Sequence, residues 1–205
     1  MKEKPILFST PMVQAILDGR KTQTRRIIKP QPESVDHVSH KTIPYNGSPE
    51  FLLSNLKCPY GQIGDMLWVR ETWWHNRETW GDSEVFLYRA DFPIDGYDHV
   101  DAYKWKPSIF MPKDVCRIKL RITDIRVERL QDISEEGAIA EGVGSGFQMN
   151  AGYPDYEHIV NGVCTITQDT AKMSYWSLWD SINGKGSWDK NPWVWVITFE
   201  RITNP

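Results

Sequence analysis

A lysine, two threonines and three arginines stand together in residues 19–26, Gly-Arg-Lys-Thr-Gln-Thr-Arg-Arg. Cations crowded in this way lower the pKa of a lysine, because each destabilises the charged form of its neighbour. A neutral Lys21 is a competent general base, and the hydroxyl of Thr22 or Thr24 would be the nucleophile within its reach. The residue types therefore predict a nucleophile–base pair.

Such a pair needs an acidic group that shuttles the proton or holds the lysine. Glu141 is one candidate, because it lies in the last turn of a predicted helix, where a carboxylate opposes the helix dipole. Either another interaction compensates for that placement or the side chain is simply exposed. Glu71, directly after an apolar segment, is the other candidate.

Strand geometry sets a condition on the pair. On a regular strand Lys21 and Thr24 face opposite sides, so the pair requires a bend, a bulge, or Lys21 still on the turn after Gly19. The alternative interpretation is a basic loop that binds an anion such as a phosphate, a nucleotide or an RNA backbone. Both interpretations stay open on the residues alone.

Two helices are expected to position these groups. Thr10 followed by a proline is typical of a helix start, Met12 to Leu17 have apolar residues at helical spacing, and Gly19 ends the helix. This helix would deliver the basic run to a fixed place. The pattern Asp-Ile-Ser-Glu from Asp132 resembles a capping box and predicts a second helix that ends at Gly142, which we expect to fold against the first segment.

The remaining elements are mostly strands. We expect strands at residues 6–8, 66–73, 85–90, 116–130 and 191–200, and a further helix at residues 171–182. This order favours an α+β fold, a partly closed mixed β-barrel flanked by short helices, over a parallel βαβ sheet. The chain of 205 residues is expected to be one domain with insertions around 31–57, 75–115 and 144–170.

Composition limits the classes of partner. With a net charge of −3 and a pI near 6.0, the chain has no global basic field for duplex nucleic acid, so any nucleic-acid contact must be local. Ten tryptophans bring large buried area and flat faces that stack on bases, and most of them are expected in the core. Oligomeric state is left open.

Cysteine and histidine spacing predicts neither metal nor cofactor. The three cysteines are far apart, and the histidines show no metal-ligand spacing, which argues against a disulfide framework and a zinc site. No signal-peptide pattern is present, and no segment approaches the ~20 apolar residues of a membrane span. We expect no membrane contact and a cytoplasmic protein.

Several segments together resemble a known family. The pattern Gly19-x-Lys21-x-x-x-x-Arg26 after a short helix, then Gly64-Asp65-x-Leu67-x-Val69, then a late strand into a capped helix, is similar to the ASCH domain. That domain belongs to the PUA-like superfamily of small β-barrels, and the resemblance covers nearly the whole chain. The longer phage and prophage type is similar at residues 58–61, 67–72, 105–108, 132–142 and 191–195.

The resemblance implies an activity. Small bacterial ASCH enzymes are N(4)-acetylcytidine amidohydrolases, and their motif matches Lys21 and Thr24 here. It implies Thr24 as nucleophile, Lys21 as base and Glu141 as proton shuttle, with Arg26 on the oxyanion or the glutamate. This chain departs from the pattern at Arg25, where the family has an apolar residue, and it is far longer.

The resemblance also implies a substrate surface and a competing class. PUA-like domains bind RNA or modified bases, and some ASCH relatives look like metal-independent ribonucleases. A nucleoside or RNA is therefore the expected partner, bound by stacking and by phosphate contacts. The residues expected to bind it are Arg25, Arg26, Trp68, Arg70, Glu71 and Trp73, with Trp74 and Trp105 nearby.

Overall fold

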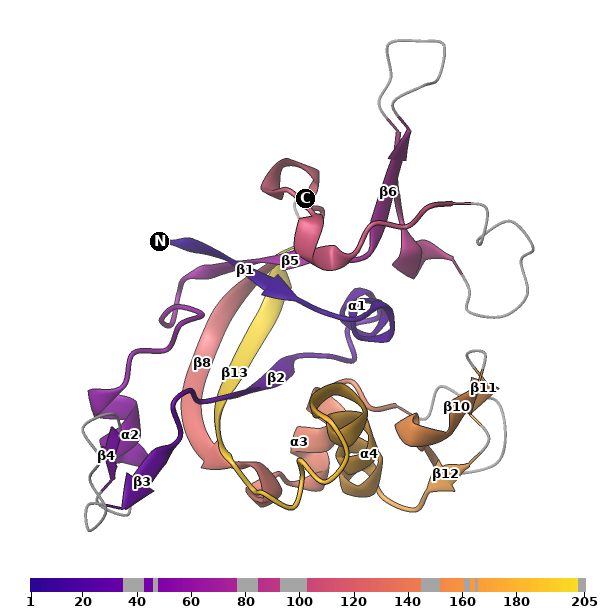
Figure 1. Ribbon diagram of the computed structural model, residues 1–205. Helices are drawn as coiled ribbons and strands as arrows, with labels where there is room; N and C mark the ends of the chain where they lie inside the picture. Colours follow the sequence, from indigo (N-terminus) through magenta and orange to yellow (C-terminus); the bar gives the residue numbers. More distant parts are fainter. Residues whose placement is uncertain are drawn as a thin grey trace.

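The structure is a computed structural model that describes residues 1–34, 43–45, 48–76, 85–92, 103–144, 152–160, 163–164 and 166–202. Its centre is a mixed five-stranded sheet with the strand order β1-β5-β8-β13-β2 (Figure 1). Within this sheet only β1 and β5 pair in parallel, and the other neighbours are antiparallel. The strands are β1 (Glu3–Leu7), β2 (Gln23–Ile27), β5 (Met66–Arg70), β8 (Lys119–Arg129) and β13 (Trp193–Ile202). The protein is thus an α+β fold, as the order of elements predicted.

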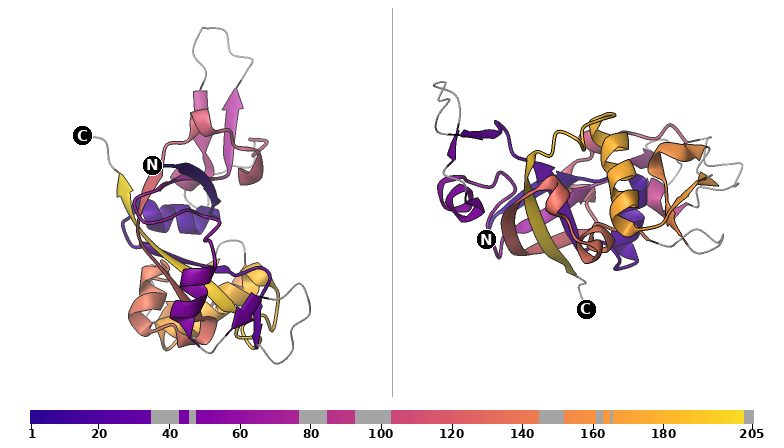
Figure 2. Two further views of the ribbon diagram at one scale, coloured as in Figure 1. Left: turned by 90° about the vertical axis from the view of Figure 1, so that its left-hand side faces the viewer. Right: turned by 90° about the horizontal axis from the view of Figure 1, so that it is seen from below.

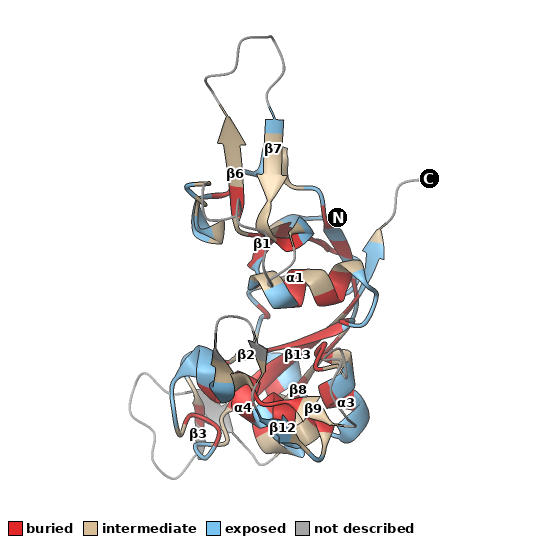
Figure 3. Ribbon diagram, turned by 90° about the vertical axis from the view of Figure 1, so that its right-hand side faces the viewer, coloured by how far each residue is buried: buried red, intermediate tan, exposed pale blue. Residues whose placement is uncertain are grey.

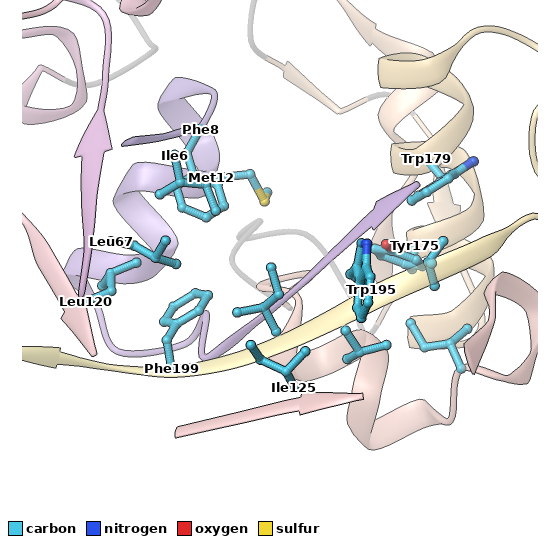
Figure 4. Packing of buried hydrophobic residues seen from close by; sticks show 14 of the residues in the cluster. Ile6, Phe8, Met12, Leu67, Leu120, Ile125, Tyr175, Trp179, Trp195 and Phe199 are labelled. Atoms are coloured by element: carbon cyan, nitrogen blue, oxygen red, sulfur yellow. The ribbon is translucent and has the colours of Figure 1, made fainter. Parts of the chain in front are cut away.

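A large part of the core lies on one face of the long β8–β13 pair, and Val194 and Val196 are buried on the other face of β13. Alternating apolar residues of both strands share the first face, because side chains on a strand alternate between its two sides. Ile197 pairs with Ile125, and after a bulge at Thr198 and Phe199 the pairing resumes with Phe199 opposite Ile122. Figure 4 shows this face packed against the residues around β1 and α1 (Thr10–Leu17). Figure 3 shows the buried residues concentrated on the sheet and on the helix sides that face it.

The sheet is curved and has two edges. β1 and β2 are the edge strands, and no pairing joins them within the described part of the chain, so no closed barrel is formed there. One side chain does join the two edges: Arg26 on β2 donates a hydrogen bond of 2.7 Å from Nη2 to the carbonyl of Leu7 on β1. The curvature therefore brings the N-terminal strand close to the basic run.

The helices begin slightly differently from the prediction. Ser9, and not Thr10, is the N-cap of α1. The capping-box prediction was wrong by two residues: Ser134 caps α3 (Glu135–Ala140) by accepting from the N–H of Gly137, because residues 130–132 form a 3₁₀ turn. The remaining helices are α2 (Pro49–Asn55) and α4 (Ala171–Asn183). Of the helices described, none has the length and apolar character to cross a membrane.

Short strand pairs occupy the three predicted insertions. Figures 1 and 2 show them at the margins of the molecule, away from the central sheet. Within the insertions, residues 35–42, 46–47, 77–84, 93–102, 145–151, 161–162 and 165 lie outside the described residues. The pairs are β3 (Pro32–Ser34) with β4 (Ile43–Tyr45), β6 (Trp73–Asn76) with β7 (Val85–Tyr88), β9 (Tyr153–Pro154) with β12 (Thr167–Gln168), and β10 (Ile159–Val160) with β11 (Val163–Cys164).

Candidate functional site

Lys21 lies on the turn between α1 and β2. Gly19 adopts a φ of 76°, and the N–H of Lys21 donates to the carbonyl of Ala15, which turns the chain back across the helix end. Lys21 therefore precedes the first residue of β2, so the strand-parity condition does not apply to it. Its side chain is buried, with only 4% of the residue exposed. The short helix thus places an ammonium group inside the molecule.

Glu141 is the partner of this buried ammonium. It caps the C-terminus of α3, and its carboxylate oxygen Oε2 lies 2.8 Å from Lys21 Nζ, which also donates to the Glu141 carbonyl at 2.6 Å. Arg25 Nη1 lies 3.3 Å from the other carboxylate oxygen, and the Tyr175 hydroxyl lies 3.4 Å from it. Two cations thus compensate for a carboxylate that opposes its own helix dipole.

The two neighbouring arginines have different partners. Arg25 is almost fully buried and pairs with Glu128 at 3.1 Å as well as with Glu141. Arg26 donates to the Leu7 carbonyl, and its guanidinium lies 5.2 Å from the centre of the Phe8 ring. The resemblance implied that Arg26 either stabilises the oxyanion or holds the glutamate. In the structure Arg25 holds the glutamate, at the position where this chain departs from the family pattern.

The burial of Lys21 and the charges around it shift its pKa in both directions, upward and downward. Burial lowers the pKa of Lys21 below its ordinary value, and the positive charges of Arg26 and Arg25 lower it further, while Glu141 counteracts them. The net direction is downward. Burial also raises the pKa of Tyr175 well above its ordinary value, so its hydroxyl stays protonated as a donor. Burial therefore shifts both groups toward their neutral forms.

Thr24, rather than Thr22, faces this site. On β2, Thr24 lies opposite Ile197 of β13 and Arg26 lies opposite Trp195, so these residues share the inner face of the strand pair. Thr24 is buried and lines a cavity, whereas Thr22 is exposed and does not. In the part of the chain that the structure describes, the Thr24 hydroxyl makes no hydrogen bond. Of the two threonines, Thr24 is therefore the one whose hydroxyl is available to a ligand in the cavity.

A cavity of about 850 Å³ opens beside Lys21, Thr24 and Glu141. Residues of α4 with the spacing i, i+3, i+4 and i+7 form one wall. Figure 4 shows Tyr175, Trp179 and Trp195 gathered beside β2, and Phe8 and Met12 on the opposite side. Pockets for small ligands have volumes of ~300–1,000 Å³ and mainly apolar and aromatic walls. The aromatic and aliphatic lining comprises Leu7, Phe8, Met12, Ile27, Ile28, Leu56, Tyr60, Tyr175, Leu178, Trp179, Ile182 and Trp195.

Four residues expected at the substrate surface do not line this cavity: Trp68, Arg70, Glu71 and Trp73. Arg70 donates to the carbonyls of Met111 and Ile109 and lies over the Trp68 ring. Trp73 is buried and stacks on His75 within the β6–β7 hairpin. Arg70 thus holds residues 109–111 to β5, and Trp73 packs within its own hairpin. None of them lies beside the Lys21–Glu141 pair.

Glu71 has a structural partner of its own. Its buried carboxylate accepts two hydrogen bonds of 2.9 Å from Arg117, which also holds both oxygens of Asp91 at 2.7 Å. Burial raises the pKa of Glu71, and Arg117 counteracts it. This cluster connects β8 to the residues that follow β5 and β7. Of the two acidic candidates, the structure therefore brings Glu141 and not Glu71 to the lysine.

The aromatic walls were not predicted, although a signal was present. The sequence predicts Met173, Trp176, Leu178 and Trp179 as the apolar positions of α4. Leu178 and Trp179 are buried, but Met173 and Trp176 are 40% and 42% exposed. The buried residues of this helix face are Tyr175, Leu178 and Trp179, and the exposed Ile182 continues the same face at the rim of the cavity. Reading Tyr175 as part of that face would have placed it beside the glutamate.

Neither a metal site nor a relative helps to identify the ligand. Among the described residues, no group of three or more histidine, cysteine, aspartate or glutamate side chains could hold a metal ion. Comparisons with protein-family models, with curated proteins and with solved structures find no match. The function must therefore be inferred from the cavity and from the groups on its walls.

Gly142 controls how closely α3 approaches Lys21. It has a φ of 90°, and an added Cβ would lie 2.9 Å from the Cβ of Ala15 and 3.0 Å from that of Lys21. We expect Gly142→Ala to destabilise the fold by about 1–3 kcal/mol more than Gly19→Ala, because overpacking adds to backbone strain. Gly19 is a matched control, since its φ is 76° and a Cβ there meets nothing within 4 Å. Urea unfolding measures the free energy of unfolding of both variants. Equal losses of stability would contradict the close packing of Gly142 against Ala15 and Lys21.

Proposed function

We propose that this protein is an ASCH-type hydrolase of the PUA-like superfamily, with a partly closed barrel, that removes an acetyl group from the exocyclic nitrogen of a cytosine base. The observation that carries the proposal is the buried Lys21–Glu141 pair at the wall of a cavity that Thr24 also lines. The absence of disulfides among Cys58, Cys116 and Cys164 fits a cytoplasmic location, which we include in the proposal.

The proposed reaction begins at Thr24. Its Oγ attacks the acetyl carbonyl carbon while the hydroxyl proton passes to the neutral amine of Lys21. The bond between the carbonyl carbon and the exocyclic nitrogen then breaks, and that proton returns to the leaving nitrogen, relayed by Glu141. Water then hydrolyses the acetyl ester on Thr24: its oxygen is incorporated into acetate, one of its protons regenerates the hydroxyl, and the other passes to solvent. Atoms and charges balance without a cofactor.

Two further groups support this reaction. Arg26 shares the inner strand face with Thr24, and we assign its guanidinium to the negative charge that develops on the carbonyl oxygen. Tyr175 and Trp195 offer flat faces on the cavity wall for a planar base. Incubation with N(4)-acetylcytidine is expected to release equal amounts of cytidine and acetate, and chromatography measures both.

The reaction should depend on the protonation of Lys21. A base must be neutral to accept a proton, and the pKa of Lys21 is below its ordinary value of 10.5. We therefore expect kcat/KM for N(4)-acetylcytidine to rise with pH through the lowered pKa and to level off above it. Values of kcat/KM measured from neutral pH up to the highest pH at which the protein stays folded test this expectation. A rate that falls with rising pH would contradict the role of Lys21.

A second candidate is a module that binds RNA or a modified base without cleaving it. The resting ion pair favours this reading, because Lys21 in contact with a carboxylate is stabilised in its charged form, which is not a base. Salt-sensitive retention of RNA, lost in Arg26→Ala, with no turnover of N(4)-acetylcytidine would support the module. Shortening of RNA in the absence of metal would instead support a ribonuclease.

A further inference from the structure

The cavity carries more positive charge than the reaction uses. Its lining includes the cations Lys21, Arg25, Arg26, Lys29 and Lys57, but Glu141 is the only carboxylate among its lining residues that the structure describes. Glu141 pairs with Lys21 and with Arg25. Arg26, Lys29 and Lys57 form no ion pair with any described residue. The proposed reaction uses Arg26, so Lys29 and Lys57 remain available to another part of the ligand.

The free cations lie on the approach to the buried groups. Lys29 follows the last residue of β2, and Lys57 follows α2. Both lysines are exposed, whereas Lys21 and Thr24 are almost fully buried. Arg26 lies between these two levels: it is partly buried and is held in place by Leu7 and Phe8. The groups that line the cavity thus range from buried reacting groups, Lys21 and Thr24, to exposed positive charges, Lys29 and Lys57.

Aromatic walls inside the cavity and exposed lysines at its edge fit a ligand that is planar at one end and anionic at the other. An uncharged nucleoside leaves Lys29 and Lys57 without a partner, although lysine ammonium groups commonly bind phosphate as point charges. The positive group is also local, because the whole chain has a net charge of −3. A general attraction to polyanions therefore does not explain it.

We infer that the ligand of this cavity is a nucleotide, whose phosphate is bound by Lys29 and Lys57 while the base lies against Tyr175, Trp179 and Trp195 on the cavity wall. The phosphate belongs either to a free mononucleotide or to one residue of an RNA strand. The inference rests on the proposed function for the identity of the base. It adds the phosphate as the feature that selects the substrate.

Calorimetric binding of cytidine and of cytidine 5′-monophosphate tests the inference without requiring turnover. At low salt we expect the nucleotide to bind wild-type protein about tenfold more tightly than cytidine, since two partly solvated charge contacts contribute an energy of that order. Lys29→Gln/Lys57→Gln should abolish this difference and leave cytidine binding unchanged. Lys2→Gln/Lys190→Gln is the matched control, because it removes the same charge from exposed lysines outside the cavity.

The outcomes separate this inference from the hydrolase proposal. Equal binding of the nucleotide and cytidine by the wild type, or an equal loss in the control variant, would overturn the inference even if acetylcytidine is hydrolysed. A lysine-dependent preference for the nucleotide without any hydrolysis would support it and reject only the hydrolase. A short single-stranded RNA identifies the phosphate source: tighter, more salt-sensitive binding than the mononucleotide indicates a strand, and equal binding indicates a free nucleotide.

Discussion

Glu141→Gln is expected to lower the free energy of unfolding by about 3–5 kcal/mol, because removal of one partner leaves a buried charge uncompensated. Here the carboxylate serves two buried cations, Lys21 and Arg25, whose side chains are 2% and 1% exposed. Glutamine has nearly the same shape, so the loss reports the charge and not a cavity. Urea unfolding followed by tryptophan fluorescence measures the difference.

Glu128→Gln is the matched control. Glu128 also pairs with Arg25, but its side chain is 23% exposed, so water compensates for much of the lost charge. We expect this variant to lose no more than about 1 kcal/mol. If both glutamine variants lose the same free energy of unfolding, the Lys21–Glu141 ion pair does not stabilise the fold more than the partly exposed Arg25–Glu128 pair does. Lys21→Met/Glu141→Leu should recover much of the stability, since it removes both charges together.

Thr24→Val is expected to reduce kcat/KM for N(4)-acetylcytidine about a thousandfold or more, because a nucleophile and its base act as one unit. Valine keeps the branched shape on β2 and removes only the hydroxyl. The stability of the fold should change little, since this hydroxyl makes no hydrogen bond among the described residues. Steady-state rates and urea unfolding, measured on the same preparation, separate lost chemistry from lost structure.

Thr22→Val provides the comparison for this prediction. Thr22 lies two residues earlier in the chain, is exposed and does not line the cavity. We expect it to retain kcat/KM within about twofold, as for a surface substitution remote from the reacting groups. If Thr22→Val loses as much activity as Thr24→Val, the orientation of β2 relative to the cavity does not decide which threonine reacts.

The meeting of Lys21 and Glu141 was predictable because two local signals agreed. The first was a basic run placed by a short helix, and the second was a carboxylate at a helix C-terminus, where the dipole disfavours it. Each signal depends only on neighbouring residues, so it can be read from the sequence. The α+β class was predictable for the same reason, from alternating apolar residues and helix stops.

The predictions that differed from the structure depended on contacts far apart in the sequence. Glu71 follows an apolar strand as expected, but its partner Arg117 is 46 positions away, and no local pattern indicates that contact. The role of Arg25 likewise depends on how β2 lies against α3. Trp68 and Trp73 were expected at the substrate surface by residue type alone, although a tryptophan stabilises a hairpin equally well.

The helix and strand boundaries differed for more local reasons. The strand expected at residues 66–73 is divided into β5 and β6, because the chain leaves the sheet after Arg70 and enters the hairpin at Trp73. Nothing in the apolar pattern marks that change of direction. The opening strand begins at Glu3, earlier than expected, because β1 extends along β5 through a proline at a sheet edge.

Release of cytidine and acetate from N(4)-acetylcytidine, compared between the wild type and Lys21→Ala, tests the central claim most directly. Both proteins should be assayed where circular dichroism shows that they are folded. The proposed site predicts equal amounts of the two products from the wild type and none above background from the variant. Intact N(4)-acetylcytidine after prolonged incubation with the wild type, or undiminished release by Lys21→Ala, would contradict it.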